Sequence, residues 1–270
     1  MLNKIIGVIG CGNMGGALIK GIVQSGEVKA ENILALDDNH KKAEAISKKY
    51  GVTARARLND LVKQADYIIL AVKPDVIEGV LKKMNKDELE DTVIISIAAG
   101  VTVKTIEKAL ECECKISRVM PNTPALVGEG MCAICYNDKI VEKEKTLIKK
   151  IFECAGKVIE VEEKHMNAIT ALSGSGPAYV FMFIEAMADA GVRMGLKRDI
   201  SYKLAAHTVL GSAKMVIETE KHPGELKDMV CSPGGTTIEA VYELEKRGFR
   251  GTIMKAIGEC YEKAEEMSEE

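Results

Sequence analysis

Three glycines near the start of the chain have the spacing of a phosphate-binding turn. The motif G-x-G-x-x-G is formed by Gly10, Cys11, Gly12, Asn13, Met14 and Gly15. In such a turn the first glycine permits a tight bend, the second lets a pyrophosphate approach the backbone, and the third lets the following helix pack closely. The N–H groups and the dipole of the helix start attract the phosphates. The motif therefore predicts dinucleotide binding.

The elements on either side of this turn decide whether the motif has that meaning. Residues 5–9 predict a buried strand, and residues 16–23 predict a helix. A strand before the glycines and a helix after them are the context that the motif requires. A glycine-rich turn without a ligand is the alternative, and the two correct flanks argue against it.

A carboxylate follows the next predicted strand, at residues 32–36. Asp37 lies about 20 residues beyond the glycines, where an acidic residue can hold the ribose 2′-hydroxyl of a cofactor. A carboxylate there favours NADH because it repels a 2′-phosphate, whereas Lys41 and Lys42 partly offset its charge. An ordinary N-cap for the helix that runs to Tyr50 explains Asp37 equally well, so the choice between NADH and NADPH stays open.

Two further predicted strands carry small residues at the same edge of the sheet. Residues 66–72 are followed by Lys73 and Pro74, and residues 93–97 are followed by Ala98 and Ala99. Ligands of open α/β sheets lie outside the carboxyl ends of the strands. The small side chains at these ends would let a planar ring approach.

The remaining strands complete an α/β pattern. Residues 115–119, 131–136 and 157–161 are predicted strands, with a helix at about 142–154. Strands that alternate with helices favour a mostly parallel sheet. Residues 120–124 (Met-Pro-Asn-Thr-Pro) contain two prolines and predict a rigid turn at the same edge.

The pattern changes at about Glu163, after which we predict helices alone. The expected helices cover about residues 166–172, 178–190, 199–218, 238–246 and 249–267. The first half of the helix at 178–190 is apolar nearly all round, and such a helix is buried on all sides. The helical segment is too short to bury it alone, so we expect a second subunit to do so in an interlocked homodimer.

Residues 232–237 (Ser-Pro-Gly-Gly-Thr-Thr) form a second site suited to an anion. Glycines expose backbone N–H groups, Thr236 and Thr237 add hydroxyls, and a predicted helix begins directly after them. This arrangement suits a carboxylate. The alternative is a plain turn in which Thr236 or Thr237 caps the helix.

Bulk properties narrow the class of protein. The chain has 270 residues, 47% of them hydrophobic and 29% charged, with a formal net charge of −3. About two domains are expected at this length, and the charge gives no basic surface for nucleic acid. Because we find no apolar run near 18 residues and no signal-peptide pattern, we expect no membrane span and a cytoplasmic location.

Cysteine usage does not predict a metal site or a disulfide framework. The chain has eight cysteines and four scattered histidines. Cys132 and Cys135 form a C-x-x-C pair, but no second pair has zinc spacing. We expect reduced thiols packed in the interior and no metal.

The absence of a lysine from one segment limits which substrates the chain could reduce. Reduction of a ketone usually needs a Lys, His or Tyr that handles the proton of the oxygen. Two-domain dehydrogenases often carry such a lysine after a glycine-rich helix start, and residues 174–181 contain none. A protonated imine removes this need, because the hydride neutralises the cation. The protein then only has to position the reactants.

The motifs span both halves of the chain. In the first half they are residues 10–15, 71–74, 96–102 and 120–124; in the second half they are residues 173–179, 222–224 and 226–237. With them the chain resembles the pyrroline-5-carboxylate reductase family over essentially its whole length. The segment 226–237 (Leu-Lys-Asp-Met-Val-Cys-Ser-Pro-Gly-Gly-Thr-Thr) is the most specific of these motifs.

The resemblance implies hydride transfer from NADPH or NADH to the imine carbon of 1-pyrroline-5-carboxylate, which gives L-proline in the last step of proline biosynthesis. It implies a Rossmann dinucleotide-binding domain at residues 1–162 and a helical dimerisation and substrate domain at residues 163–270. It also implies a homodimer that can assemble further.

The resemblance also assigns residues. Thr236 and Thr237 would hold the substrate carboxylate, with Ser232 and Gly235 nearby and Glu163 close to the substrate. Thr237 would also bond the ring nitrogen, which makes it the expected catalytic residue. The nicotinamide would lie against two stretches at strand ends, and Asn59 would lie on the adenine side. The two stretches are Ala71, Val72, Lys73 and Pro74, and Ala98 and Ala99.

Two features depart from the family pattern, and two rival functions remain. Many relatives place polar or basic residues where this chain has Asp37 and Asp38, and the pair Cys132 and Cys135 has no counterpart. One rival is a two-domain dehydrogenase of the hydroxyacid kind, which the absent lysine argues against. The other is a non-enzymatic dinucleotide-binding protein, which would not need residues 232–237.

Overall fold

The structure is a computed structural model that describes residues 3–269. The chain forms two compact units. The sheet unit contains the chain up to Ser175 together with the segment from Cys260 onward, and the helical unit is Gly176–Glu259. The expected boundary after residue 162 lies inside the sheet unit, directly before the 3₁₀ turn Glu163–His165.

Eight strands form one sheet in the order β3-β2-β1-β4-β5-β6-β7-β8. Their bounds are β1 Ile6–Ile9, β2 Ile33–Leu36, β3 Thr53–Ala54, β4 Tyr67–Leu70, β5 Val93–Ser96, β6 Lys115–Met120, β7 Gly130–Tyr136 and β8 Gly156–Glu160. Neighbouring strands are parallel except β6 and β7. The α/β class with a Rossmann-type sheet and a helical second part is confirmed. The short edge strand β3 was not predicted.

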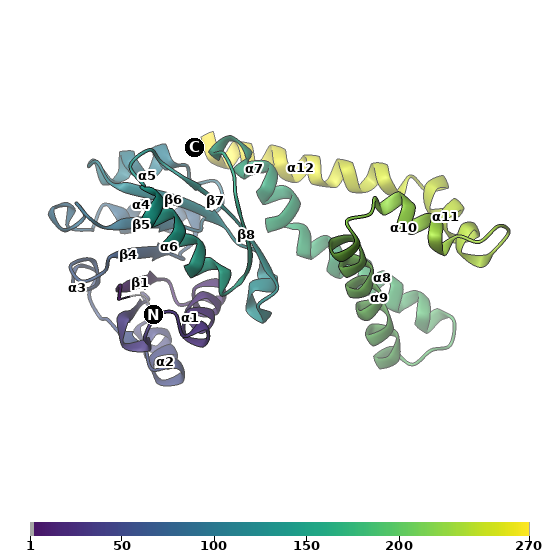
Figure 1. The fold of residues 1–270 in the computed structure, drawn as a ribbon, viewed down its shortest axis with the longest axis horizontal. Helices are drawn as coiled ribbons and strands as arrows, with labels where there is room; N and C mark the ends of the chain where they lie inside the picture. The colour runs from purple at the N-terminus through teal and green to yellow at the C-terminus, as the bar shows by residue number, and fades with distance from the viewer. Residues whose placement is uncertain (1–2, 270) are drawn as a thin grey trace. The chain divides into compact units, whose positions relative to one another are not determined.

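Helices cover both faces of this sheet (Figure 1). One face packs against α1 Asn13–Ser25, α2 His40–Tyr50 and α6 Glu142–Glu153. The other face packs against α3 Leu58–Val62, α4 Pro74–Leu81 and α5 Val103–Leu110. Because successive strand residues point to opposite faces, Val8 joins the first layer and Ile9 the second. This double burial explains why the strands are apolar runs rather than alternating patterns.

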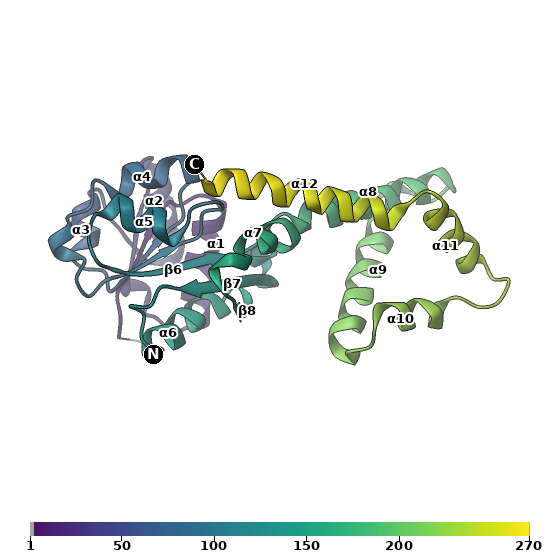
Figure 2. The same ribbon diagram turned by 90° about the horizontal axis from the view of Figure 1, so that it is seen from above.

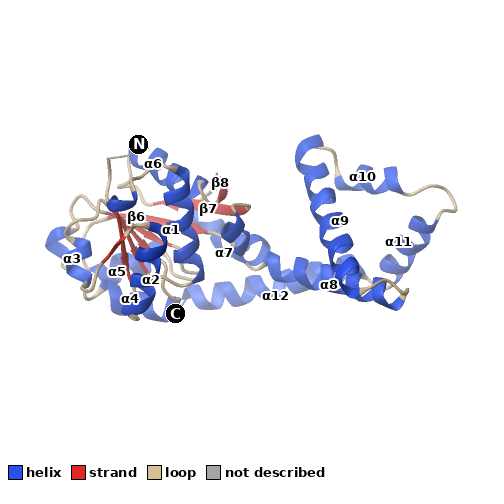
Figure 3. Ribbon diagram, turned by 90° about the horizontal axis from the view of Figure 1, so that it is seen from below, coloured by secondary structure: helices blue, strands red, loops and turns tan. Residues whose placement is uncertain are grey.

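The sheet reverses its order between β1 and β4. From β1 the chain first builds β2 and β3 on one side and then returns to β4 on the other. Ile9 at the end of β1 pairs in register with Leu70 at the end of β4. The two carboxyl ends therefore lie next to each other, at the kind of switch point where open α/β sheets bind ligands. Figure 3 shows the strands between their helices.

The last residues of the described chain pack onto the sheet unit. Helix α7 Met166–Ile169 is followed by a π-helical turn at Thr170–Gly174. Asn167 of α7 donates to Glu265 and accepts from Ser268 Oγ at 3.1 Å; both partners lie in α12 Phe249–Glu269. A Cβ at Gly100 would lie 2.9 Å from Cβ of Met267. The end of α12 is thus a structural part of the sheet unit.

The helical unit contains α8 Gly176–Arg193, α9 Arg198–Thr219, α10 Pro223–Val230 and α11 Thr236–Lys246, and the first part of α12 (Figure 2). Helices α8 and α9 cross closely, because a Cβ at Gly191 would lie 2.7 Å from Ser201 Oγ. Helix α10 was not predicted, although Pro223 at its first position and the His222 cap are recognisable start signals.

The apolar side chains of α8 are not buried within one chain. Phe181 is 61% exposed and Met182 is 70% exposed. Only small residues of α8, among them Ala188 and Gly191, are buried. Among residues 3–269, no helix is long and apolar enough to cross a membrane. The exposed face of α8 therefore calls for a cover that a single chain does not supply.

Candidate functional site

The glycine-rich turn joins β1 to α1, and each of its glycines has its own geometric reason. Gly10 has φ +101°, and a Cβ there would lie 2.4 Å from the Ala71 carbonyl oxygen. A Cβ at Gly15 would lie 1.9 Å from the Gly10 carbonyl oxygen. Around Gly12 the space is open, with no heavy atom within 4 Å of a Cβ position. The turn thus packs tightly on one side and leaves its backbone accessible on the other.

Helix α1 begins directly at this turn. Its N-cap is Gly12, which supplies no side-chain hydrogen bond. The first N–H groups of a helix have no acceptor within the helix, so they are suited to an anion such as a pyrophosphate. Gly12 without a Cβ leaves room for that anion to approach.

Asp37 lies at the end of β2 and is fixed against the turn. Its Oδ2 accepts from the Cys11 backbone N–H at 2.7 Å, and its Oδ1 accepts from the Asn39 N–H at 3.0 Å. Lys42 Nζ is 3.8 Å from Oδ1, and the Asp37 side chain is 6% exposed. The N-cap of α2 is Asn39, so the interpretation of Asp37 as an ordinary N-cap is wrong.

A cavity of about 680 Å³ lies at the carboxyl ends of β1, β2 and β4. Of the residues expected to bind the cofactor, six line it: Gly10, Gly12, Asp37, Ala71, Val72 and Lys73. Cys11 and Asn13 line a neighbouring depression. The residues predicted at the pyrophosphate, ribose and nicotinamide positions therefore converge from separate strands on one place in the sheet unit, and the open Gly12 backbone fits a dinucleotide there.

Six other expected cofactor residues are not in the cavity lining. Met14 and Gly15 lie in α1, and Pro74 is the first residue of α4. Ala98 and Ala99 follow β5. Asn59 lies in α3, where its Oδ1 accepts from the Asn85 backbone N–H at 3.0 Å. The structure thus brings Leu58, rather than Asn59, to the cavity wall.

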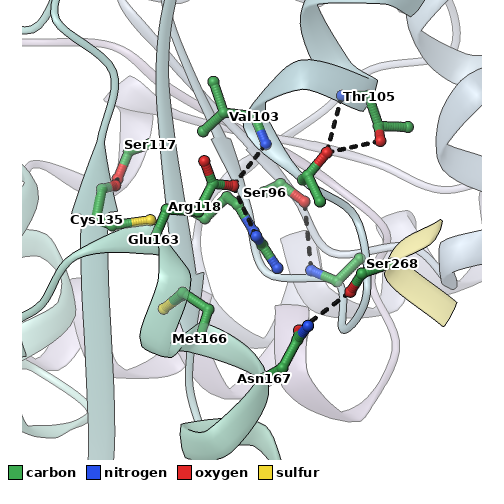
Figure 4. A network of polar contacts seen from close by, with 12 residues as sticks. Ser96, Val103, Thr105, Ser117, Arg118, Cys135, Glu163, Met166, Asn167 and Ser268 are labelled. Atoms are coloured by element: carbon green, nitrogen blue, oxygen red, sulfur yellow. Dashed lines mark hydrogen bonds and ion pairs between the residues drawn. The ribbon is translucent and has the colours of Figure 1, made fainter. Parts of the chain in front are cut away.

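The loop after β5 is held by a network of polar contacts (Figure 4). Glu163 Oε1 accepts from the Val103 backbone N–H at 2.8 Å and from Arg118 Nη1 at 2.7 Å. Thr102 caps α5 by accepting from the Thr105 N–H at 3.0 Å. The Ala98 N–H donates to Ser96 Oγ at 3.3 Å. These contacts fix both ends of the segment that carries Ala98 and Ala99.

Glu163 therefore joins the start of α5 to β6, a contact that the residue pattern alone did not indicate. Its partner Arg118 is in the middle of β6 and its side chain is 4% exposed. A buried guanidinium requires a paired anion. The signal in the sequence was an arginine within the otherwise apolar second half of that strand.

Two other motifs meet at Asn122. Its Nδ2 donates to the Ser173 carbonyl at 3.2 Å, and its Oδ1 accepts from the Met131 N–H at 2.9 Å. A Cβ at Gly174 would lie 3.3 Å from Met120 Sδ. The Pro-Asn-Thr-Pro turn is thus tied to the π-helical turn, and Gly174 permits their close approach.

Four of the five residues expected to bind the substrate, Ser232, Gly235, Thr236 and Thr237, lie together in the helical unit, whereas Glu163 lies in the sheet unit. Gly234 has φ +65°, and the Gly235 N–H donates to the Ser232 carbonyl at 3.0 Å. Helix α11 begins at Thr236, with Gly235 as its N-cap and no side-chain cap. The interpretation of Thr236 or Thr237 as the N-cap is therefore wrong. The turn presents Thr236 and Thr237 in the first helical turn, where N–H groups and hydroxyls suit a carboxylate.

Four cysteines of the sheet unit, Cys11, Cys114, Cys132 and Cys135, are buried as free thiols. Burial raises the pKa of Cys132 to about 12 and that of Cys135 to about 11. Burial, and after it the charge of Asp37, raises the pKa of Cys11 to about 12. Within residues 3–269 no group of three or more His, Cys, Asp or Glu side chains could hold a metal ion.

Comparisons with known proteins cover the whole chain. Residues 163–267 match the family model "Pyrroline-5-carboxylate reductase dimerisation", and residues 5–100 match "NADP oxidoreductase coenzyme F420-dependent". The pyrroline-5-carboxylate reductase of Escherichia coli K12 is 45% identical over 99% of both chains. That of Glycine max is 40% identical over 97% of this chain and 96% of its own.

Solved structures agree with these relatives. A Plasmodium falciparum pyrroline carboxylate reductase with NADP bound is 38% identical, with a TM-score of 0.91 over 99% of both chains. A Coxiella burnetii pyrroline-5-carboxylate reductase is 36% identical, also with a TM-score of 0.91 over 99% of both chains. The similarity thus extends through the sheet unit and the helical unit alike.

Proposed function

The chain belongs to the pyrroline-5-carboxylate reductase family, and from this premise we propose how its residues divide the reaction. It is an oxidoreductase that uses NADPH or NADH and reduces 1-pyrroline-5-carboxylate to L-proline, the last step of proline biosynthesis. The observation that carries this function is the 45% identity over 99% of both chains. It favours the reductase over a hydroxyacid dehydrogenase or a non-enzymatic binding protein.

The sheet unit holds the dinucleotide. The N–H groups at the start of α1, with the open backbone of Gly12, bind the pyrophosphate. Asp37 faces the ribose of the adenosine half, and Ala71, Val72 and Lys73 line the cavity beyond. When bound, the reduced nicotinamide supplies the hydride that the imine carbon accepts. Asn122 and the Glu163 network support this site by fixing the loops that follow β6 and β5.

The helical unit holds the substrate. The backbone N–H groups and hydroxyls of Thr236 and Thr237 bind the carboxylate, with Ser232 and Gly235 beside them. The Thr237 hydroxyl also bonds the ring nitrogen and so orients the C=N bond. Helix α11 contributes its positive N-terminal end to the same carboxylate.

No side chain has to transfer a proton to an oxygen in this reaction. The imine binds as a cation, and hydride addition neutralises it to the amine. Rate enhancement then comes from holding donor and acceptor atoms in line. Residues 174–181 carry no lysine, and none is required.

The protein is a homodimer, and the exposed apolar face of α8 is suited to a second copy. We propose that dimers can assemble further, which light scattering on purified protein would test by molar mass. The expected cytoplasmic location stays a prediction, and fractionation of the source cells would test it.

The assay is imine-dependent loss of absorbance at the reduced-nicotinamide band. Thr237→Ala should lower kcat by roughly a hundredfold to a thousandfold, the range for one lost oriented donor, and Thr237→Val should lower it further by adding bulk. The matched control is Thr146→Ala in α6, whose hydroxyl only bonds back to the Glu142 carbonyl at 2.9 Å. Unchanged kinetics in both Thr237 variants would remove this residue from the mechanism.

A further inference from the structure

The acidic residue at the end of β2 is fixed rather than free to swing away. Both oxygens of Asp37 accept backbone N–H groups, from Cys11 at 2.7 Å and from Asn39 at 3.0 Å. Its side chain is 6% exposed, yet it lines the dinucleotide cavity together with Gly10 and Gly12. A ligand in this cavity therefore meets a carboxylate whose position is set before binding.

This carboxylate still has acceptor capacity. Each carboxylate oxygen offers about two lone-pair directions, and the backbone hydrogen bonds use one on each oxygen. The remaining directions can accept hydroxyl donors from a ribose diol. Such hydrogen bonds to a charged acceptor are stronger than neutral ones.

Two cations near Asp37 already have an acidic partner, and Lys73 and Lys83 also line the cavity. Lys42 Nζ lies 3.8 Å from Asp37 Oδ1 itself, and His40 Nε2 lies 3.4 Å from Glu44 Oε1. Asp38 adds a second carboxylate to the same wall of the cavity. A ribose 2′-phosphate carries a charge of about −1.5 to −2, and its oxygens act mainly as hydrogen-bond acceptors rather than donors. It would replace one attractive hydrogen bond, from the ribose 2′-hydroxyl, by repulsion from a carboxylate that cannot move away.

We propose that Asp37 selects NADH over NADPH in this protein. The proposal deepens the function given above and rests on it. The charge of Asp37 also acts on its surroundings, because it adds to burial in raising the pKa of the adjacent Cys11 thiol. The competing explanation is that Asp37 only clamps the glycine-rich turn through the Cys11 N–H, a task that a neutral acceptor can perform equally well.

The first test is direct binding by isothermal titration calorimetry, which needs no imine. The wild-type dimer is titrated with NADH and NADPH, and then with the fragments 5′-ADP and 2′,5′-ADP. We expect NADH to bind roughly 10- to 100-fold more tightly than NADPH, the range for one charge-assisted hydrogen bond. The preference should narrow as salt is raised, because added ions screen the repulsion of the 2′-phosphate. Equal or tighter binding of NADPH would overturn the proposal.

The second test is a matched pair of neutralised carboxylates. Asp37→Asn keeps an acceptor for the Cys11 N–H and removes the charge, so the NADH-to-NADPH affinity ratio should fall to near one. Asp38→Asn removes the same charge from an exposed neighbour and should change the ratio by less than about threefold. An unchanged ratio in Asp37→Asn would show that Asp37 is only a clamp, and an equal change in Asp38→Asn would show that the fixed position of Asp37 is not what selects the cofactor. If Asp37→Asn does not fold by circular dichroism, the wild-type fragment titration still overturns the proposal when 2′,5′-ADP binds as tightly as 5′-ADP.

The proposed function and the proposed selectivity fail in different ways. If both cofactors bind equally and imine-dependent oxidation occurs, the reductase function stands and the role of Asp37 is wrong. If NADH binds selectively and no imine is reduced, the proposed function is wrong while the selectivity of Asp37 stands.

Discussion

The sheet unit buries its apolar side chains within one chain, whereas the helical unit does not. In the sheet unit Phe152, Leu18 and Ile69 are fully buried. In the helical unit Met182 is 70% exposed and Ile217 is 75% exposed. Both units have complete, regular helices. Local structure and burial are therefore specified separately here. Neighbouring residues determine the helices of both units. Burial comes from the same chain in the sheet unit and, as we propose, from a second copy in the helical unit.

The side chains buried in the helical unit show how little core a single chain provides there. They are small residues at the crossing of α8 and α9, such as Ala188, Ser201 and Ala205. These small side chains let the backbones of α8 and α9 approach each other, but their burial removes little apolar surface from water. The sheet unit, with large side chains on both faces of a parallel sheet, has the core of an independent domain.

The largest expected effect is the loss of stability caused by a cavity in the core of the sheet unit. Phe152→Ala removes a fully buried ring from α6 and should lower the free energy of unfolding by about 3–5 kcal/mol. The loss should be the same at every protein concentration, because the packing partners of the ring lie within one chain. Urea unfolding followed by circular dichroism measures it, and a midpoint equal to that of the wild type would contradict a self-contained sheet unit.

The second effect is weaker dimerisation, which should depend on the protein concentration. Phe181→Ala truncates a ring that is 61% exposed in one chain and should weaken dimerisation by about 2 kcal/mol if the ring anchors the interface. Sedimentation equilibrium gives the dimer constant. Val127→Ala is the control, since Val127 is 75% exposed in the sheet unit and should change stability by less than about 0.5 kcal/mol. Equal dimer constants for the two variants would remove α8 from the interface.

A similar effect is expected at the Glu163 network. Glu163→Gln leaves the buried Arg118 without its anion and should cost about 2 kcal/mol, at the low end because Glu163 is 38% exposed. Glu162→Gln is the control, because Glu162 is 71% exposed. A positioning role predicts that cofactor affinity falls while KM for the imine is unchanged. A raised KM with normal cofactor affinity would instead favour direct binding of the substrate by Glu163.

The last effect is a loss of stability in alkaline solution, expected in the sheet unit. Burial raises the pKa values of Cys132 and Cys154 from 9.0 to about 12, so folding favours their protonated form. That contribution is complete below pH 9.0 and is lost as the pH rises toward 12, by about 1.4 kcal/mol per thiol and pH unit. Urea unfolding between pH 8 and 10 measures the slope. Cys132→Ala should flatten it above pH 9, and an unchanged slope would contradict the burial of this thiol.

Much of the fold could be predicted because its signals are local. Apolar runs fix the strands of the sheet unit, and glycines fix the turn before α1. The two residues of β3 carry no period, and the edge strand was missed. The alternatives that made Asp37 the N-cap of α2, or Thr236 or Thr237 that of α11, are wrong because Asn39 and Gly235 cap these helices without a side-chain hydrogen bond.

The candidate site was predictable only where its interactions are short in sequence or follow strand ends. The pairing of Arg118 with Glu163 joins residues that are 45 positions apart. An arginine in an apolar strand indicates that an anion is needed, but nothing in the spacing identifies Glu163 as that anion. The same holds for Asn122 and Ser173, 51 positions apart. The clamp between Asp37 and Cys11 N–H is equally non-local, and it decides that Asp37 faces the dinucleotide cavity instead of capping α2.

The return of α12 to the sheet unit has a consequence for synthesis on the ribosome. The hydrogen bond between Ser268 and Asn167 joins residues 101 positions apart, and Met267 packs against Gly100. Translation runs from the N-terminus, so the helical unit emerges before these interactions can form. The Rossmann sheet can collapse early. Its contacts with the end of α12 form only after Met267 and Ser268 have been synthesised. A nascent chain halted after α11 would therefore carry a loosely closed nucleotide domain, open to proteases at the loop around Gly100.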